Sequence, residues 1–192
     1  MDAENGPIVL FSTWFKEAQA AEINDAGAMA LATYDPTAKR ISNRIVFLRG
    51  VDETGVLFFT HRDSPKSADL LQHPNAALTF HWKSLRRQVR MEGFVRSATT
   101  QEVNAFFASR TRKAQLDIWA SKQSQPLKSR EVLVGDRAAF EADDQLECPD
   151  HWCGYRLVLD RVEFWASDRD DSHDRFVFEK RGTGWGETLL YP

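Results

Sequence analysis

Cationic and hydroxyl side chains at the ends of strand-like segments are the first residues that could do chemistry. Arg44 and Arg49 bracket the apolar run IVFL, and Thr60 ends the next strand-like segment. Lys66 follows in the first turn of an expected helix, near the positive end of the helix dipole. Guanidinium, hydroxyl, ammonium and helix N-terminal N–H groups together suit a phosphate. Taken alone, however, this pattern is more typical of exposed charges at strand ends.

Several other polar or aromatic residues could contact a ligand, although each has an ordinary structural explanation. Gln88 begins a strand-like segment, and Gln123 and Ser124 lie where an expected helix passes into a loop. Trp165 ends the segment VEFW, where a core position is more common than a ligand platform. His173 lies beside an acidic run, where solvation is more common than function. No single residue among these decides the function.

Helices must position part of this set. The sequence predicts helices over 7–24, 64–73, 99–110, 110–125 and 129–145. Ser64 and Pro65 form a helix start, with Ser64 as N-cap. Thr99 and Glu102 have the spacing of a capping box. The last two helices are expected to be amphipathic or to lie at the margin of the domain.

Strands must position the rest. Strand-like segments are AMALATY, SNRIVFLRG, VLFFTH, AALTFHW, QVRMEGFVRS, YRLVLDRVEFW, DRFVFEK and GWGETLLY. Along SNRIVFLRG a period of two places Arg44 and Val46 on one face and Ile45 on the other. Gly93 marks a possible β-bulge. Six to eight strands with short turns predict one mainly β domain over 1–192, a closed or nearly closed antiparallel barrel with helices at its margins.

Composition excludes several classes of protein. The 192 residues carry a net charge of −3, which gives no general reason to expect a nucleic-acid or membrane partner. The N-terminal residues form no long apolar run, so neither a signal peptide nor a membrane span is expected. Cys148 and Cys153 are not spaced as C-x-x-C, and reduced thiols in a cytoplasmic protein are favoured over a disulfide framework or a zinc site.

Seven motifs follow one another along the chain: NRIVFLR, FFTHRDSPK, HWKSLRRQVRMEG, SRTRKAQLDIWASKQS, HWCGYRL, VEFW and SHDRF. In this order they resemble the pyridoxamine 5'-phosphate oxidase family, and the resemblance extends over nearly the whole chain. It implies an FMN-binding split β-barrel that forms a homodimer and holds FMN in clefts at the subunit interface. The aromatic residues would then serve partly as a dimer interface.

The resemblance also implies a set of cofactor contacts. The FMN-binding residues would be Arg44, Ile45, Val46, Phe59, Thr60, Lys66, Gln88, Gln123, Ser124, Trp165 and Arg175. Thr60 and Lys66 match the groups that hold the FMN phosphate, and Gln88 matches an amide that reaches the flavin ring from the partner subunit. One position departs from the family, because Pro65 replaces an arginine. Arg62 is the nearest substitute.

The substrate side departs further from the family. Arg49, Phe106, Arg110 and Ala114 stand where the family has a lysine, a tyrosine, an arginine and a serine that hold the substrate phosphate. Both cations are therefore kept in kind, whereas both hydroxyl donors are lost. Each lost hydrogen bond to a charged group would cost about 1.5–3 kcal/mol.

The acidic run near the C-terminus carries the catalytic candidates, His173 and Asp171. The family pattern is Arg-x-His-Asp-Arg, with the first arginine and the histidine over the substrate ring. Here Asp171 replaces that first arginine, while His173 and Arg175 are kept. An aspartate at this position favours a cationic or hydroxyl-bearing substrate, unless Arg169 takes the place of the missing guanidinium.

Four functions remain open on the sequence. The first is an FMN-dependent oxidase that converts pyridoxamine or pyridoxine 5'-phosphate to pyridoxal 5'-phosphate, with hydride transfer to flavin N5 and reduction of O2 to H2O2. The second is a related FMN oxidoreductase with a different, non-B6 substrate, which the altered residues at 106, 114 and 171 favour. The third is a flavin-binding protein without turnover, and the fourth is a β-barrel interaction domain without a cofactor.

Overall fold

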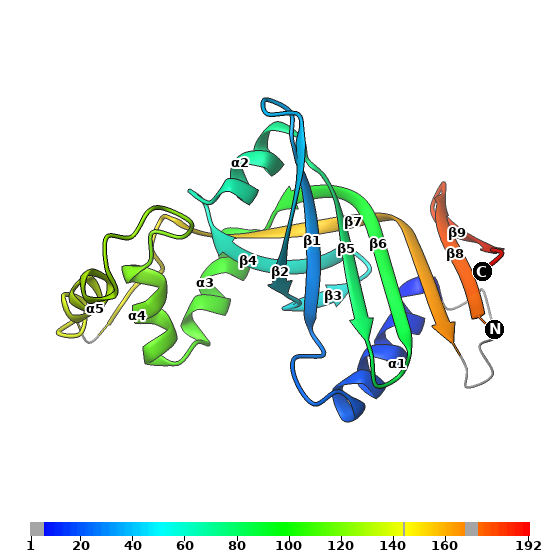
Figure 1. Ribbon diagram of the computed structural model, residues 1–192, viewed down its shortest axis with the longest axis horizontal. Coiled ribbons are helices and arrows are strands. Elements are labelled where there is room, and N and C mark those ends of the chain that lie inside the picture. Colours follow the sequence, from blue (N-terminus) through cyan, green and yellow to red (C-terminus); the bar gives the residue numbers. More distant parts are fainter. Residues whose placement is uncertain (1–5, 144, 168–172) are drawn as a thin grey trace.

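One antiparallel sheet organises the chain. The computed structural model describes residues 6–143, 145–167 and 173–192 (Figure 1). Its strands are β1 (Ala28–Asp35), β2 (Arg40–Phe47), β3 (Gly50–Asp52), β4 (Gly55–His61), β5 (Asn75–Trp82), β6 (Arg87–Ser97), β7 (Trp152–Ser167), β8 (His173–Arg181) and β9 (Gly184–Leu189). They follow the order β2-β1-β5-β6-β7-β4-β3, with β8 paired to β7 and β9 paired to β8. The eight predicted strands are confirmed, and the short β3 is added.

The long strand β7 joins the two parts of the sheet. Its first half pairs with β4, from Trp152 to Leu157, and its second half pairs with β8, from Arg161 to Ser167. On its other side β7 pairs with β6, and the register shifts between Glu92 and Gly93. A Cβ atom on Gly93 would lie 2.0 Å from the carbonyl oxygen of Val158, so the close approach requires glycine. The predicted bulge is confirmed.

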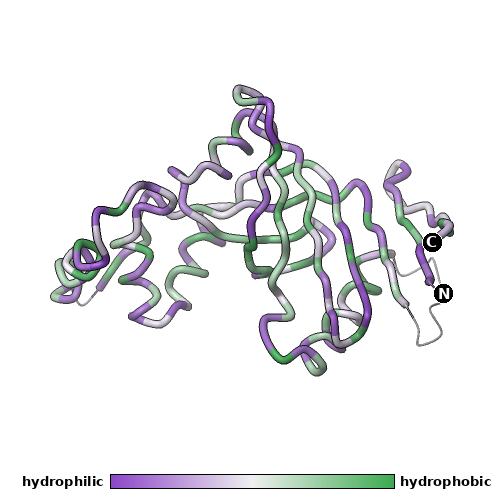
Figure 2. Tube along the Cα trace, viewed as in Figure 1, coloured by the Kyte–Doolittle hydropathy of each residue, from purple (hydrophilic) through white to green (hydrophobic). Residues whose placement is uncertain are grey.

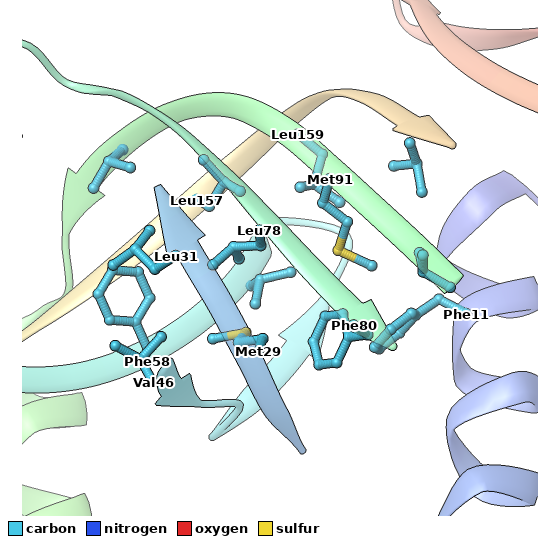
Figure 3. Packing of buried hydrophobic residues seen from close by; sticks show 14 of the residues in the cluster. Phe11, Met29, Leu31, Val46, Phe58, Leu78, Phe80, Met91, Leu157 and Leu159 are labelled. Carbon is cyan, nitrogen blue, oxygen red and sulfur yellow. The ribbon is translucent and has the colours of Figure 1, made fainter. Parts of the chain in front are cut away.

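The barrel core is apolar and joins the two ends of the curved sheet. Val46 of β2 and Phe58 of β4 belong to the same buried cluster (Figure 3). Phe11 of the first helix packs 5.0 Å from Phe80, measured between ring centroids. Figure 2 shows hydrophobic residues along the central strands and hydrophilic residues at the β1–β2 turn. The predicted class, mainly β with an antiparallel barrel and peripheral helices, is confirmed.

The predicted first residues of the helices lie closer to the observed ones than the predicted last residues do. They are α1 (Gly6–Ala21), α2 (Pro65–Gln72), α3 (Thr100–Ala108), α4 (Arg112–Ala120) and α5 (Arg130–Ala138). The capping box of Thr99 and Glu102 is present at α3. Ser64 occupies the N-cap position of α2, but its side chain contacts the Ser67 hydroxyl at 3.2 Å and makes no capping bond.

Two predicted helices were too long. The helix expected over 110–125 ends at Ala120, because Ser121 has extended backbone and Ser124 is left-handed, with φ of 67°. The helix expected over 129–145 ends at Ala138, and none of its residues is buried. Its apolar side chains, including Val134, are exposed. No helix in the described part of the chain is both long and apolar enough to cross a membrane.

Candidate cofactor and substrate site

A cavity of about 340 Å³ lies between the barrel and the helices α3 and α4. We call it the cationic cavity. It is lined by Ile45, Val46, Phe47, Arg49, Phe59, Thr60, Lys66, Phe106, Arg110, Ala114, Asp117, Ile118, Gln123 and Trp152. Most of the predicted FMN-phosphate residues and all four predicted substrate-phosphate residues therefore meet in one place.

Lys66, Thr60 and Gln123 form a hydrogen-bonded group inside the cationic cavity. The Lys66 ammonium donates to Thr60 Oγ1 at 3.0 Å and to Gln123 Oε1 at 2.6 Å, and the Thr60 hydroxyl donates to Gln123 Oε1 at 3.0 Å. Lys66 is 8 % exposed, in the first turn of α2, and Thr60 lies near the end of β4. A buried ammonium whose partners in the described part of the chain are all neutral oxygens favours an anion as its further partner.

Arg44 lies close to this group, and its guanidinium contacts side chains of β1 and α2. Its guanidinium donates to Thr33 Oγ1 at 2.7 Å and lies 3.8 Å from Asp69. Burial lowers the pKa of Arg44, and the Asp69 carboxylate partly opposes that shift. Val46 is buried and Ile45 is 61 % exposed, so the predicted alternation along β2 is confirmed.

A second pair of cations in the same cavity surrounds Phe106. The Phe106 ring stacks on Phe59, with centroids 4.2 Å apart and an interplanar angle of 3°. The guanidinium carbons of Arg49 and Arg110 each lie 5.4 Å from the Phe106 centroid. Burial and the nearby Arg110 lower the pKa of Arg49, an effect that Asp25 partly opposes.

Neither Arg49 nor Arg110 forms an ion pair with a carboxylate in the described ranges of the chain. Ala114 lies beside them in the first turn of α4, where its backbone N–H donates to the Thr111 hydroxyl. Two guanidinium groups that are held near one ring and form no ion pair within the described ranges can bind a phosphate or a carboxylate of a ligand.

Three further predicted residues, Gln88, Trp165 and Arg175, line a different cavity of about 300 Å³. We call it the Trp165 cavity. It is lined by His81, Gln88, Arg90, Glu163, Trp165, Arg175 and Pro192. Gln88, Trp165 and Arg175 face one another across β6, β7 and β8, and the His173 ring lies 5.2 Å from the Trp165 ring. An indole, an amide and a guanidinium suit a planar ring with polar edges.

The two cavities lie toward opposite ends of β7, since Trp152 at its start lines the cationic cavity and Trp165 near its end lines the other. In Figure 1, α3 and α4 lie beyond one end of the barrel and β8 beyond the other. Ser124 lines neither cavity and is exposed. Asp171 lies outside the described residues, as do Arg169 and Ser172.

Several residues of these cavities were not identified by sequence reasoning, and two of them, Trp152 and Glu163, carry buried polar groups. Trp152 lines the cationic cavity, and its indole N–H is buried without a partner among the described residues. Glu163 lines the Trp165 cavity and is 3 % exposed, although a glutamate in a strand usually faces solvent. A signal for Glu163 existed, because it is two residues before Trp165 and therefore on the same face of β7.

The cationic cavity has the donors that a phosphate such as that of FMN requires, and binding of a phosphate there would depend on pH. Burial, and then the nearby Arg44, lowers the pKa of Lys66 from 10.5 to about 8. Since the phosphate dianion binds the protonated amine, FMN affinity of the apoprotein should be steady between about pH 6 and 8. Above pH 8 the affinity should fall by up to about tenfold per pH unit. Titration of apoprotein with FMN from pH 6 to 10 checks this, and a flat profile would contradict it.

Comparison with known proteins identifies the family. Residues 15–141 match the family model described as pyridoxamine 5'-phosphate oxidase, and residues 152–192 match the pyridoxine 5'-phosphate oxidase C-terminal dimerisation region. The pyridoxine/pyridoxamine 5'-phosphate oxidase of Rhodospirillum rubrum is 45 % identical, with 98 % of each chain covered. The protein of the same name from Sphingopyxis alaskensis is 43 % identical over 97 % of this chain and 87 % of its own. The chain belongs to the pyridoxamine 5'-phosphate oxidase family.

Solved structures agree with this assignment. The chain is similar to PhzG from Burkholderia lata 383, solved in complex with tetrahydrophenazine-1-carboxylic acid, with a TM-score of 0.91 and 30 % identity. This match covers 99 % of the chain and 96 % of PhzG. A pyridoxamine 5'-phosphate oxidase-related, FMN-binding protein from Nostoc punctiforme has the same fold, with a TM-score of 0.81, 18 % identity and full coverage of both chains.

Proposed function

We propose that this protein oxidises pyridoxamine or pyridoxine 5'-phosphate to pyridoxal 5'-phosphate. Membership of the family makes it an FMN-dependent oxidoreductase, and the identity of its substrate is the proposal. One observation carries it. The cationic cavity contains two separate groups of donors, Lys66 with Thr60 and Gln123, and Arg49 with Arg110. One group suits the phosphate of the cofactor and the other suits the phosphate of a substrate.

We further propose that FMN lies between two copies of the chain. The match of residues 152–192 to a C-terminal dimerisation region supports a homodimer. The cationic cavity of one subunit would hold the FMN phosphate, and the Trp165 cavity of its partner would contact the flavin ring. This arrangement explains why the predicted FMN residues form two clusters that are far apart within one chain.

The chain's own residues would bind and orient the substrate. Arg49 and Arg110 would hold the anionic group of the substrate, and His173 would help to orient its ring from the partner subunit. Bound FMN supplies the hydride acceptor and, with O2, the route to H2O2. The contribution of the protein is to hold the reacting carbon close to the flavin and in the right orientation.

Anaerobic mixing with pyridoxine 5'-phosphate tests the substrate. The visible absorption of the bound flavin should bleach in a single turnover, because hydride transfer reduces FMN and no O2 reoxidises it. Unphosphorylated pyridoxine should bleach it at least about tenfold more slowly at equal concentration, since the two arginines then have no anion to bind. Full flavin binding with no bleaching by any phosphorylated B6 compound would contradict the proposal.

A different substrate on the same site is the second candidate. Phe106 and Ala114 offer no hydroxyl where a phosphate would accept further hydrogen bonds. The molecule in complex with PhzG is a ring carboxylic acid, and a carboxylate would also suit two guanidinium groups. Bleaching by a carboxylated heterocycle, but not by B6 phosphates, would favour this candidate. Flavin binding without bleaching by any donor would favour a protein without turnover.

We also propose that the whole chain, 1–192, is one domain. Strand β7 belongs to the region matched by the second family model, and it pairs with β4 and β6 from the region matched by the first. A location in the cytoplasm is proposed as well, since Cys148 and Cys153 are both free thiols. The proposed partners are a second copy of the chain and a small-molecule substrate, with no nucleic acid or membrane.

A further inference from the structure

A buried carboxylate lies at the base of the Trp165 cavity. Glu163 is 3 % exposed, and a buried charge is tolerated only where it is paired and hydrogen-bonded. Its Oε1 atom accepts from Arg175 Nε at 2.8 Å, and its Oε2 atom accepts from an Arg161 terminal nitrogen at 2.9 Å. Arg90 approaches Oε2 at 3.5 Å. Three guanidinium groups therefore converge on one carboxylate.

The three arginines differ in how much they depend on Glu163. Arg90 and Arg161 share a second carboxylate, Glu92, at 2.9 and 3.1 Å. Arg175 has no carboxylate partner other than Glu163 within the described ranges. Of the two carboxylates, Glu163 and Glu92, it is therefore Glu163 that fixes the position of the Arg175 side chain.

The hydrogen bond to Arg175 uses Nε and not the terminal nitrogens. Both terminal NH2 groups are left without a protein partner in the described part of the chain, and the side chain is one-third exposed. Arg175 lies directly opposite Trp165 in the sheet, and Trp165 lies opposite Gln88. The free end of the guanidinium is thus available to a ligand of the Trp165 cavity.

Glu163 is ionised in this arrangement. Burial alone would raise the pKa of Glu163, but the hydrogen bonds from Arg175 and Arg161 and the charges of Arg90 and Arg175 together outweigh burial and hold the pKa below its ordinary value. The carboxylate can therefore act as a fixed negative anchor across the neutral pH range.

We propose that Glu163 is a positioning residue for the cofactor, which fixes Arg175 through Nε so that its terminal NH groups contact the flavin ring. This inference rests on the proposed function, since it takes the ligand of the Trp165 cavity to be FMN. Glu163 itself would touch neither the cofactor nor the substrate. Its effect on FMN would pass through Arg175.

A double-mutant cycle on FMN affinity tests the inference, with FMN titrated into apoprotein. Glu163→Gln should weaken FMN binding about tenfold, because the acceptor that fixes Arg175 changes from a carboxylate to an uncharged amide and the ion pair is lost. In the Arg175→Gln background Glu163→Gln should alter FMN affinity by less than about twofold, since the guanidinium that Glu163 positions is absent. Glu179→Gln is the matched control. Glu179 is more exposed and lies 3.9 Å from Arg161, so FMN affinity should be unchanged.

The visible spectrum of bound FMN gives a second readout that a merely structural role would not move. Glu163→Gln should shift the spectrum toward that of Arg175→Gln, and the double variant should match Arg175→Gln. An equal loss of affinity in both backgrounds, or wild-type affinity and spectrum in Glu163→Gln, would overturn the inference. If Glu163→Gln alone does not fold, the double variant is compared with Arg175→Gln, where equal affinity supports the inference and unequal affinity overturns it.

The outcomes separate this inference from the proposed function. Wild-type protein that binds FMN and is reduced by substrate, together with an unaffected Glu163→Gln variant, would overturn only the role of Glu163. Wild-type protein that takes up no FMN would overturn both.

Discussion

Replacement of Lys66 by methionine is expected to weaken FMN binding about 10- to 150-fold. The Lys66 ammonium is buried beside Thr60 and Gln123, where it can donate to a phosphate. A hydrogen bond from a charged donor contributes about 1.5–3 kcal/mol, which corresponds to that range of affinity. Titration of apoprotein with FMN, followed by quenching of flavin fluorescence, measures the change. The decrease in affinity above pH 8 should disappear in the same variant.

The same variant should not lose stability as apoprotein. The pKa of Lys66 is about 8 in the folded protein and 10.5 as an ordinary lysine. Below pH 8 the amine is protonated in both states, so the cost of burying its charge is fully present at pH 7. That cost is relieved as pH rises from 8 to 10.5. Methionine removes the charge at similar length, and thermal unfolding of the apo variant at pH 7 should occur at or above the wild-type temperature.

A matched control separates the phosphate contact from a general charge effect. Lys16→Met removes one lysine from an exposed position on α1 and should leave FMN affinity unchanged. Full retention of FMN by a folded Lys66→Met variant would mean that the phosphate does not bind in the cationic cavity.

Restoring two hydroxyl groups is expected to improve the use of a phosphorylated substrate. In the double variant Phe106→Tyr with Ala114→Ser, KM for pyridoxine 5'-phosphate should fall by about tenfold to a thousandfold. Each hydroxyl can add a hydrogen bond to the phosphate worth about 1.5–3 kcal/mol, and neighbouring bonds are not fully additive. Both positions line the same cavity as Arg49 and Arg110. Steady-state oxidation followed by H2O2 release measures the effect.

A variant that folds poorly would not show a lower KM, so a fall in KM is a specific test of the phosphate contact. Ala108→Ser adds a hydroxyl on the exposed side of α3 and serves as the control, with KM unchanged. If KM for pyridoxine 5'-phosphate does not fall in the double variant, its phosphate does not bind between Arg49 and Arg110. A lower KM for a carboxylated ring compound alone would then favour the second candidate substrate.

Local features of the fold could be predicted because their causes lie in neighbouring residues. The capping box at α3 needs only Thr99 and Glu102, three residues apart. The faces of β2 follow from alternation, which placed Val46 and Ile45 on opposite faces, and the structure buries Val46 and exposes Ile45. The bulge at Gly93 has a local signal as well. The predicted end of α4 was wrong because Ser121 is extended and Ser124 is left-handed, which periodicity does not show. The predicted end of α5 was wrong as well, since that helix ends at Ala138.

The candidate site could be predicted only in part. Composition and spacing indicated phosphate donors, but no periodicity shows that Gln123 meets Lys66, which is 57 residues away in sequence. That prediction came from resemblance to a family. The division into two cavities was not visible either, since it depends on β7 pairing with β4 along one half and with β8 along the other. The buried carboxylate of Glu163 was missed because its pairing with Arg175 is a cross-strand contact.

Sedimentation velocity, recorded both in the protein band and in the visible flavin band, most directly tests whether FMN binds between two subunits. One FMN should sediment per chain, in a species of twice the 22.0 kDa chain mass. Dilution that dissociates this species should release the flavin at the same time. Flavin that sediments with a monomer, or a colourless dimer in excess FMN, would contradict binding between the cationic cavity of one subunit and the Trp165 cavity of its partner.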